Sequence, residues 1–429
     1  MERFDVVVVG AGLAGIAAAH SAAAAGRSVL LIERGKAPGT KTVSGGLLYG
    51  HALARIVPDF WTLDPSPVER PIVRNILAFL TDAQAVSVDH FDPRFGRPPF
   101  NSFSVLRHRL DAWLAERAEA AGAVPVYGIR VDRLLTDGDR VVGVRAGDDE
   151  IGAEVTVLAD GVNSLLVRGP NARPEADPSV VGVGVKQVLE LPTGTLEERF
   201  QLKDGDGVQI TTIGHPSGLE GGGFLYTNRS SLSLGFIANL RSLVASGRSL
   251  DEVWDEFQRH PLVARWIEGG RLVEYSGCFV TEGGYRALPQ LAGPGYLVAG
   301  SAAGLFLNTG FTLRGMDFAL ESGRIAGEVA AEAAAAKDPA PARLERYVAR
   351  LEASFVLREL KSHRGYPKVF ANRRLYGAYP EAINALLHDL YFVDGAGRRH
   401  LDGVARGALR GRASWWSLAQ DLIGAGRRL

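Results

Sequence analysis

The hydrophobic pattern of the first 35 residues predicts a strand, a helix and a second strand in close succession. An apolar run at residues 4–9 leads directly into Gly10, an alanine-rich segment extends to Ala25, and a second predicted strand at 27–32 ends at Glu33. Short apolar runs beside a glycine turn are typical of buried strands, and the longer alanine-rich segment is typical of a helix. The order strand, glycine turn, helix, strand, acid is that of a complete dinucleotide-binding unit.

The glycine turn carries the chemistry of this unit. Gly10 permits a tight turn, Gly12 lets a pyrophosphate approach the backbone, and Gly15 lets the helix pack on the sheet. The helix N-terminus also presents free N–H groups to the phosphates. The glycines alone would be weak evidence for a nucleotide site, because many turns use glycine for positive φ without a ligand. Here the predicted strands on both sides of the turn and helix support the nucleotide-binding interpretation. The predicted binding residues are Gly10, Ala11, Gly12, Leu13, Ala14 and Gly15.

The acid at the end of the second strand narrows the choice of ligand. Glu33 lies eighteen residues after Gly15, where a carboxylate can accept hydrogen bonds from both ribose hydroxyls. A carboxylate at this place disfavours a 2′-phosphate. The expected ligand is therefore FAD or NAD rather than NADP.

Further along the chain the pattern alternates between nucleotide-domain elements and β-rich segments. Residues 58–100 contain seven Pro and no long helical pattern, which suggests an excursion into a second domain. Strands are expected at 102–106, 124–131, 141–145 and 154–159, with a turn at 136–139 and an amphipathic helix at 110–121. Strands with alternating polarity follow at 181–189, 207–213, 223–226 and 231–237, with a helix at 250–258.

The last part of the chain returns to the first domain and then becomes helical. Residues 295–300 form a second strand leading into glycine, and a helix is expected at 316–335. The predicted fold is α/β, with a Rossmann-like nucleotide domain, an inserted β-rich substrate domain and a helical C-terminal region. The predicted boundaries are 1–75, 102–175 and 285–342 for the nucleotide domain, 76–101 for the excursion, 176–284 for the β-rich domain and 343–429 for the helical region.

Composition and charge exclude several function classes. The chain has 48 basic and 48 acidic residues, a balance that implies no nucleic-acid footprint. Its one cysteine, Cys278, can form neither an intrachain disulfide nor an iron–sulfur cluster, which needs about four Cys ligands. The chain enters its first strand without a basic leader, and no apolar run reaches the roughly 18 residues of a spanning helix. We expect a protein that is soluble or lies on a membrane surface.

Several motifs resemble those of a known flavoprotein family. It includes the electron-transfer-flavoprotein:quinone oxidoreductases and the FixC-type proteins and, more distantly, geranylgeranyl reductases and aromatic hydroxylases. The shared flavoprotein motifs are Gly10 to Gly15, Arg107-x-x-Leu110-Asp111-x-x-Leu114, Ala159-Asp160-Gly161 and Gly300-x-Ala302-Ala303-Gly304. Motifs resembling the FixC branch are Gly184-Val185-Lys186, residues 221–228, Glu282-Gly283-Gly284-Tyr285 and residues 308–317.

The resemblance implies FAD as the cofactor, in an FAD-binding domain of the glutathione reductase type. Residues 39–49 are rich in small side chains, so their backbone can approach a flat ring, and residues 310–313 are expected at a helix N-terminus beside the flavin, where the helix dipole stabilises negative charge. Together with the glycine turn and Glu33, the expected FAD-binding residues are Arg34, Lys41, Ser44, Gly45, Gly46, Arg107, Val131, Asp160, Gly161, Ser301, Gly304, Gly310, Phe311, Thr312 and Leu313.

Two departures from the family pattern are visible. Ser301 stands where the family normally has an Asp that bonds a ribityl hydroxyl, and a Ser can still make one such bond. The Cys-rich cluster domain of the mitochondrial quinone oxidoreductases is absent. FixC-type proteins lack that domain too and work with a small separate ferredoxin.

The resemblance predicts an enzyme that passes electrons from electron-transfer flavoprotein subunits to a membrane quinone, with a small ferredoxin-like iron–sulfur protein as a further partner. No catalytic side chains and no metal ligands are expected, since the flavin performs the chemistry. Two alternatives stay open: a reductase of isoprenoid double bonds, and a non-catalytic flavin-bearing subunit of a larger complex. The expected location is cytoplasmic and peripheral, on the inner face of the cell membrane. Segments 91–100 and 415–423 are the candidate membrane contacts. Packing of the tail helix on its own domain or on a partner is an equally weighted alternative. Arg358, Lys361, Arg364, His108 and His363 are interpreted as surface features.

Overall fold

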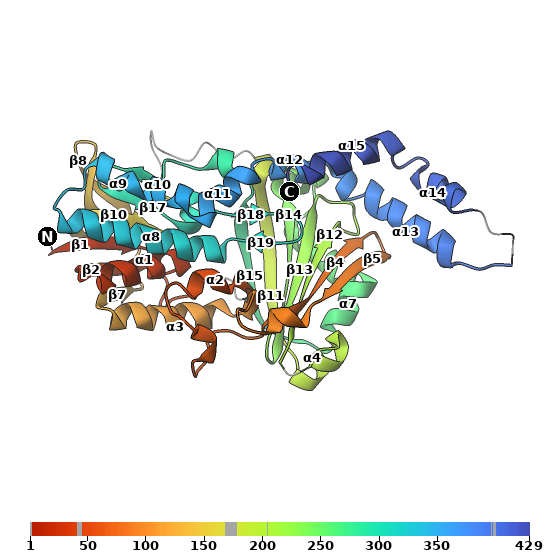
Figure 1. The fold of residues 1–429 in the computed structure, drawn as a ribbon, viewed down its shortest axis with the longest axis horizontal. Coiled ribbons are helices and arrows are strands. Elements are labelled where there is room, and N and C mark those ends of the chain that lie inside the picture. The colour runs from red at the N-terminus through yellow and green to blue at the C-terminus, as the bar shows by residue number, and fades with distance from the viewer. Residues whose placement is uncertain (1, 41–44, 168–177, 204, 396, 398–399) are drawn as a thin grey trace.

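Two large sheets dominate the structure, a computed structural model that describes residues 2–40, 45–167, 178–203, 205–395, 397 and 400–429. The sheets lie next to each other along the long axis of the molecule, and the C-terminal helices extend past the second sheet (Figure 1). This arrangement confirms the predicted fold class of an α/β protein with a second β-rich sheet and a helical C-terminal region. The division into domains at particular residues stays a prediction.

The first sheet has five parallel strands at its centre. Its order is β17 (Tyr296–Val298), β10 (Asp149–Leu158), β1 (Glu2–Val9), β2 (Val29–Glu33) and β7 (Ala123–Tyr127), with β16 (Ala292–Gly293) antiparallel at one edge and the hairpin of β8 (Arg133–Asp137) and β9 (Arg140–Ala146) attached to β10. The central strands are apolar on both faces, as strands covered by helices must be. All four valines at 6–9 are buried.

Helices α1 (Leu13–Ala24) and α8 (Met316–Ala335) pack against each other unusually closely. A Cβ atom placed on Gly323 would lie 2.0 Å from the Ala14 carbonyl oxygen, and one on Gly327 would lie 2.2 Å from the Ala18 carbonyl oxygen. Only glycine fits at both positions. The close contact explains why both helices are rich in alanine and glycine.

The second sheet is almost entirely antiparallel. Its order is β15 (Arg271–Thr281), β11 (Val181–Glu190), β14 (Ser231–Asn239), β13 (Gly221–Thr227), β12 (Gly207–Ile213), β4 (Ile72–Leu80) and β5 (Ala85–Phe91), and only β12 and β4 run parallel. The core of this part includes Trp254 and Phe257 of α6 (Leu250–Arg259), which pack against buried strand residues such as Phe236. The neighbouring helices are α4 (Thr193–Phe200), α5 (Leu240–Ser246) and α7 (Pro261–Ile267).

The chain ends in a series of helices that run from the first sheet across the second (Figure 1). They are α9 (Pro341–Leu344), α10 (Arg346–Ala353), α11 (Phe355–Ser362), α12 (Tyr366–Phe370), α13 (Ala378–Tyr391), α14 (Leu401–Leu409) and α15 (Trp415–Gly426). Among the described helices, none is long and apolar enough to cross a bilayer.

Several predicted elements need correction. The strand expected at 124–131 ends at Tyr127, because Gly128 has a φ of +78° and turns the chain, which leaves Val131 in a loop. Residues 46–49, assigned to a small-residue segment, form strand β3 (Gly46–Tyr49), which pairs with β6 (Ser102–Val105). Several described elements were not predicted, among them β4, β5, β8, α4, α5, α7 and β15.

Candidate functional site

Four neighbouring parallel strands bring the predicted binding residues to one edge of the first sheet. β2 ends at Glu33, β1 leads into Gly10, β10 leads into Asp160 and β17 leads into the turn that carries Ser301. These strands are adjacent in the order β17, β10, β1, β2, and all run in the same direction. Ligands of open α/β sheets bind outside the carboxyl ends of the strands. We call these four strand ends, with their following turns, the cradle.

The glycines of the first turn have different tasks. Gly10 has a φ of +101°, and a Cβ atom on Gly15 would lie 1.8 Å from the Gly10 carbonyl oxygen, so the fold requires both. A Cβ atom on Gly12 would meet only the Arg107 Nη2 atom, at 3.9 Å. Gly12 therefore faces open space at the N-terminus of α1, where the first turn holds no acidic residue. That positive helix end suits a phosphate.

Glu33 holds the glycine turn in place. Its carboxylate accepts hydrogen bonds from the Ala11 N–H at 2.9 Å and the Gly35 N–H at 2.6 Å. Each carboxylate oxygen has a second lone pair, so both can still accept a bond from a ribose hydroxyl. The neighbouring Arg34 is exposed, whereas Leu13 and Ala14 are buried at the start of α1.

Arg107 lies above the glycine turn at the start of α3 (Arg107–Ala120). Its Nε and Nη2 atoms donate to the two carboxylate oxygens of Asp111 at 2.7 and 2.8 Å. Asp111 is completely buried. Burial raises the pKa of Asp111, and the Arg107 guanidinium opposes that rise. A bidentate pair of this kind fixes the guanidinium plane, so a cation is held within reach of the open side of Gly12.

Asp160 contributes an unsatisfied acceptor to the cradle. Its Oδ2 atom accepts from the Leu165 N–H at 3.2 Å, while Oδ1 is buried and has no hydrogen-bond partner among the described residues. Burial raises the pKa of this carboxyl. Buried polar atoms are nearly always partnered, so Oδ1 indicates a place for a ligand donor such as a hydroxyl. The next residue, Gly161, turns the chain with a φ of +87°.

The turn after β17 packs on the start of α1. A Cβ atom on Gly300 would lie 2.6 Å from the Ala14 Cβ, and the Gly300 N–H donates to the Ser322 Oγ at 3.0 Å. This contact places Ser301 beside the glycine turn, where its side chain is exposed. Gly304, with a φ of +73°, ends the short helix η5 (Gly300–Ala303).

The glycine pair at 45–46 is packed between the two sheets. A Cβ atom on Gly45 would lie 2.1 Å from the Ser233 Oγ in β14, and one on Gly46 would lie 2.8 Å from the Met316 Cε at the start of α8. The backbone here is therefore enclosed by both parts of the protein. Lys41 and Ser44, also expected to bind FAD, lie outside the described residues.

Residues 310–313 form a hairpin and do not form a helix N-terminus as expected. Residues 309–312 connect β18 (Leu307–Asn308) to β19 (Leu313–Arg314), and α8 begins only at Met316. The hairpin is held by polar side chains: the Asn308 Oδ1 accepts from the Gly310 N–H at 2.8 Å, and the hydroxyls of Thr309 and Thr312 are 2.8 Å apart. Phe311 at its tip is 66% exposed.

Lys186 is a further candidate residue whose role was not predicted, although it belongs to the Gly184-Val185-Lys186 motif. It projects from β11 of the second sheet, with its Nζ atom 5.3 Å from the centroid of the Phe224 ring. Burial lowers the pKa of Lys186, and the nearby Arg107 lowers it further. The second sheet thus places the Lys186 amine within electrostatic reach of Arg107. A lysine inside an apolar strand was the sequence feature that could have identified it.

A cavity of about 80 Å³ lies beyond the hairpin, lined by Gly310, Leu313, the glycines of β13 and the aromatic side chains of α12. Glu282 accepts a bond from the Asn308 Nδ2 at 3.2 Å, and burial raises the pKa of Glu282. The Tyr366 hydroxyl is buried and has no hydrogen-bond partner in the described part of the chain. The lining combines apolar and polar side chains, as small-molecule sites do, but the cavity is smaller than the roughly 300 to 1,000 Å³ that is usual for such sites.

The comparisons with known proteins agree with this geometry. Residues 5–162 match the model of the FAD dependent oxidoreductase family, and residues 358–429 match that of the ETF-QO/FixC family C-terminal domain. The chain is 43% identical to Protein FixC of Escherichia coli (strain K12) over 396 residues, which cover 92% of each chain. The chain belongs to the ETF-QO/FixC family. As a member of that family it is an FAD-dependent oxidoreductase, and FAD is its cofactor.

Two further relatives of the ETF-QO/FixC type cover nearly the whole chain. The probable electron transfer flavoprotein-quinone oxidoreductase YdiS of Escherichia coli (strain K12) is 42% identical over 92% of each chain. Protein FixC of Azotobacter vinelandii is 35% identical over 98% of this chain and 97% of that protein. Among solved structures, a geranylgeranyl bacteriochlorophyll reductase-like protein from Thermoplasma acidophilum shares the fold, with a TM-score of 0.72 and 18% identity over 99% of this chain and 100% of that chain.

The residues of the cradle fit FAD. The open side of Gly12, the helix end beneath it and the fixed Arg107 guanidinium suit the pyrophosphate. Glu33 has free lone pairs for a ribose, and the unpartnered Asp160 Oδ1 can accept from a hydroxyl. Which residues contact FAD stays a prediction for the whole set.

Proposed function

We propose that this protein passes electrons from an electron-transfer flavoprotein to a membrane quinone. The observation that supports this proposal is the cavity beyond the hairpin. It adjoins residues 310–313, which are expected beside the flavin ring. The Tyr366 hydroxyl, which lines it, is a buried hydrogen-bond donor with no partner among the described residues. A quinone head group is a flat ring whose carbonyl oxygens only accept hydrogen bonds, so it matches such a cavity. The family relationship and the name of the YdiS relative support the same reaction.

The protein's own residues would orient the reactants and set the electrostatics. FAD, when bound, supplies the electron chemistry, accepting and releasing electrons in one- or two-electron steps. The Arg107 guanidinium lies at the open side of Gly12 in the cradle, and a cation there favours negative charge in a partly buried site. Lys186 lies within electrostatic reach of Arg107, and the pKa of the lysine is lowered by burial and further by that guanidinium. Glu282, with its raised pKa, could hold a proton near the cavity.

An iron–sulfur carrier, if the reaction uses one, has to be a separate chain. Cys278 is the single cysteine, whereas a cluster needs about four cysteine ligands. We therefore propose a small ferredoxin-like partner. Co-purification from the native host should recover a small Cys-rich protein and flavoprotein subunits, and an isolated chain that repeatedly shows fully coupled activity would contradict this partner.

We further propose that the protein binds peripherally to the inner face of the cell membrane, because a quinone tail is buried in the bilayer. Helix α15 exposes Trp415, Trp416, Leu422 and Ile423 by 56 to 72%. Aromatic residues of this kind are enriched at the membrane boundary. Phe91, 60% exposed on the edge strand β5, is a second candidate contact.

The quinone site can be tested with Tyr366→Phe. Loss of one hydrogen-bond donor should raise the KM for a short-tailed quinone analogue about fivefold to tenfold, since such a bond contributes roughly 1 kcal/mol. Tyr376→Phe is the matched control: Tyr376 lines the same cavity, but its hydroxyl already donates to the Phe370 carbonyl at 3.0 Å. Unchanged quinone kinetics in Tyr366→Phe would place the quinone elsewhere.

A further inference from the structure

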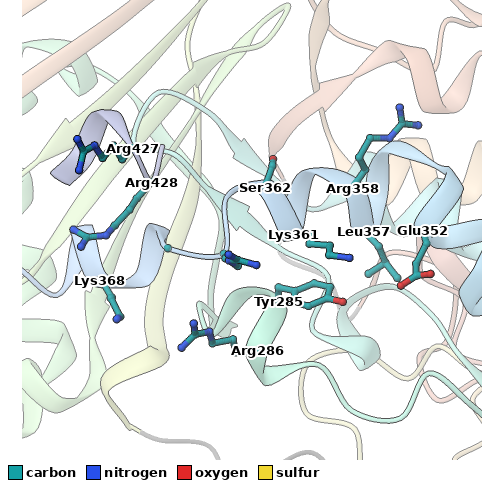
Figure 2. A pocket seen from close by; sticks show the side chains of 12 residues that line it. Tyr285, Arg286, Glu352, Leu357, Arg358, Lys361, Ser362, Lys368, Arg427 and Arg428 are labelled. Carbon is teal, nitrogen blue, oxygen red and sulfur yellow. The ribbon is translucent and has the colours of Figure 1, made fainter. Parts of the chain in front are cut away.

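A large hollow on the surface is lined mainly by cations. It has a volume of about 730 Å³ and lies where η4 (Gly284–Ala287), α11, α12 and the end of α15 come together (Figure 2). The cationic residues that line it are Arg286, Arg358, Lys361, Arg364, Lys368, Arg427 and Arg428. We call this hollow the basic pocket. All seven residues are exposed to solvent.

The described residues around the basic pocket do not balance its positive charge. Glu352 is the one acidic residue that lines it, and none of the seven cations forms an ion pair with a described residue. The chain as a whole carries equal numbers of basic and acidic residues, and many arginines elsewhere are paired, such as Arg55 with Glu321. A concentration of like charge is unfavourable by itself, so the natural complement is an anion.

An apolar surface begins directly beside the pocket, on α15. Trp415 and Leu422 are exposed along one side of this helix, and Trp416 and Ile423 lie next to them. The opposite side is anchored to the protein, because Asp421 accepts from the Arg374 Nε at 2.8 Å and also binds the Tyr379 hydroxyl. The helix thus directs its apolar side outward. Arg427 of the pocket follows Ile423 by four residues, which is one helical turn.

We propose that the basic pocket binds the phosphate headgroup of an anionic phospholipid while the apolar side of α15 enters the headgroup region of the same bilayer. This inference rests on the peripheral location included in the proposed function. Clustered cations beside exposed aromatic and aliphatic residues match both parts of such a lipid. Tyr285, which also lines the pocket, adds apolar surface for the atoms next to the phosphate. An acidic protein would account for the charge but not for the exposed tryptophans.

The test is flotation of the full-length, FAD-loaded protein with phosphatidylcholine vesicles, with and without phosphatidylglycerol. Binding should require phosphatidylglycerol and weaken as salt increases. The triple variant Lys361→Gln, Arg364→Gln, Lys368→Gln removes three cations that have no ion-pair partner among the described residues. Its partition coefficient should fall roughly 100-fold, at about fivefold for each cation lost near an anionic surface.

A matched control distinguishes the effect of losing cations in the pocket from the effect of a lower net charge on the whole protein. The triple variant Arg133→Gln, Arg241→Gln, Arg265→Gln makes the same charge change at exposed positions outside the pocket and outside the candidate membrane contacts, and its binding should stay within about twofold of the unmodified protein. Equal losses in both triple variants would overturn the proposal, as would unchanged binding in the pocket variant. A truncation after Gly411 that floats as well as the intact protein would contradict the role of α15.

An occupant of the basic pocket other than a lipid headgroup would give different results in these binding experiments. The lipid assignment would also be overturned if the protein failed to float with vesicles but its pocket residues bound inorganic phosphate or an acidic protein. Reduction of a short-tailed quinone analogue is measured without vesicles, and the pocket variant should retain it. Protein that floats normally but cannot reduce any quinone would contradict the proposed function and leave the lipid site standing.

Discussion

The cradle and the C-terminal helices are held together by different kinds of contact. In the cradle, backbone packs on backbone: glycines allow α1, α8 and the strand ends to approach within distances that no side chain permits. In the C-terminal region, side chains make the connections, such as Arg374 with Asp421 and Arg412 with Glu381, and large apolar side chains stay exposed. The cradle should therefore tolerate a new side chain only where its backbone faces open space, as at Gly12, whereas substitutions in the C-terminal helices should leave the rest of the fold intact.

The largest effect is expected from Gly323→Ala. The new Cβ atom would lie 2.0 Å from the Ala14 carbonyl oxygen, so α1 and α8 must separate, at a cost of about 3 kcal/mol or more. Gly194→Ala is the control, because nothing lies within 4 Å of its added atom, and it should be neutral or stabilising by up to about 1 kcal/mol. Denaturant unfolding measures both, and similar stabilities would refute the close packing of the two helices.

Gly12→Val should separate ligand binding from folding. A Cβ atom there meets only the end of Arg107, at 3.9 Å, so the chain should fold but lose most of its FAD, because the side chain occupies the place of the pyrophosphate. The measurements are flavin absorbance per chain and the circular dichroism of the FAD-free protein. An undiminished flavin content would show that the pyrophosphate lies elsewhere.

Ser301→Asp should strengthen FAD binding. A carboxylate at this exposed turn of the cradle would supply a charge-assisted hydrogen bond, which contributes roughly 1 to 3 kcal/mol, and the dissociation constant of FAD should fall accordingly. Isothermal titration of the FAD-free protein with FAD measures the change. A clear loss of affinity would mean that the site has been rebuilt around serine.

The smallest effect is expected in the tail, from Asp421→Asn. The hydrogen bond from Arg374 lowers the pKa of Asp421 to about 2, below the roughly 3.9 of an unfolded Asp. The stabilisation is therefore fully present above pH 4 and is lost as the pH falls toward 2. Since the pair is partly exposed, its loss should cost about 1 kcal/mol or less.

Hydrogen exchange of α15 reports this change locally. At neutral pH the Asp421→Asn variant should exchange faster in α15 with unchanged exchange in α1 and α8. Asp402→Asn, which removes an exposed pair within α14, is the control and should leave α15 unaffected. If hydrogen exchange were faster in every part of the chain, the stability of the C-terminal helices would not be independent of that of the cradle.

Local patterns made part of the structure predictable. The bounds of α8 follow from a long apolar pattern, and the cradle residues follow from motifs whose parts are adjacent in sequence. The strand β15 was missed because it lies at a sheet edge and mixes Arg, Glu and Ser with its apolar residues. The hairpin at 307–314 depends on bonds among polar side chains, such as that between Thr309 and Thr312, which an apolar pattern does not show.

The features that require the three-dimensional fold could not be predicted. The role of Lys186 depends on which face of β11 turns toward the first sheet. The basic pocket collects cations from residues 286, 358–368 and 427–428, so each segment alone resembles an ordinary charged surface. Both features depend on contacts between segments that are far apart in the sequence.

Rapid mixing of the FAD-loaded protein with a reduced electron-transfer flavoprotein, followed by a short-tailed quinone analogue, tests the proposed electron path most directly. The bound flavin should bleach on mixing with the flavoprotein and regain its absorbance when the quinone is added, with both steps fast enough to support turnover. A flavin that the flavoprotein cannot reduce, or that stays reduced in the presence of quinone, would contradict it.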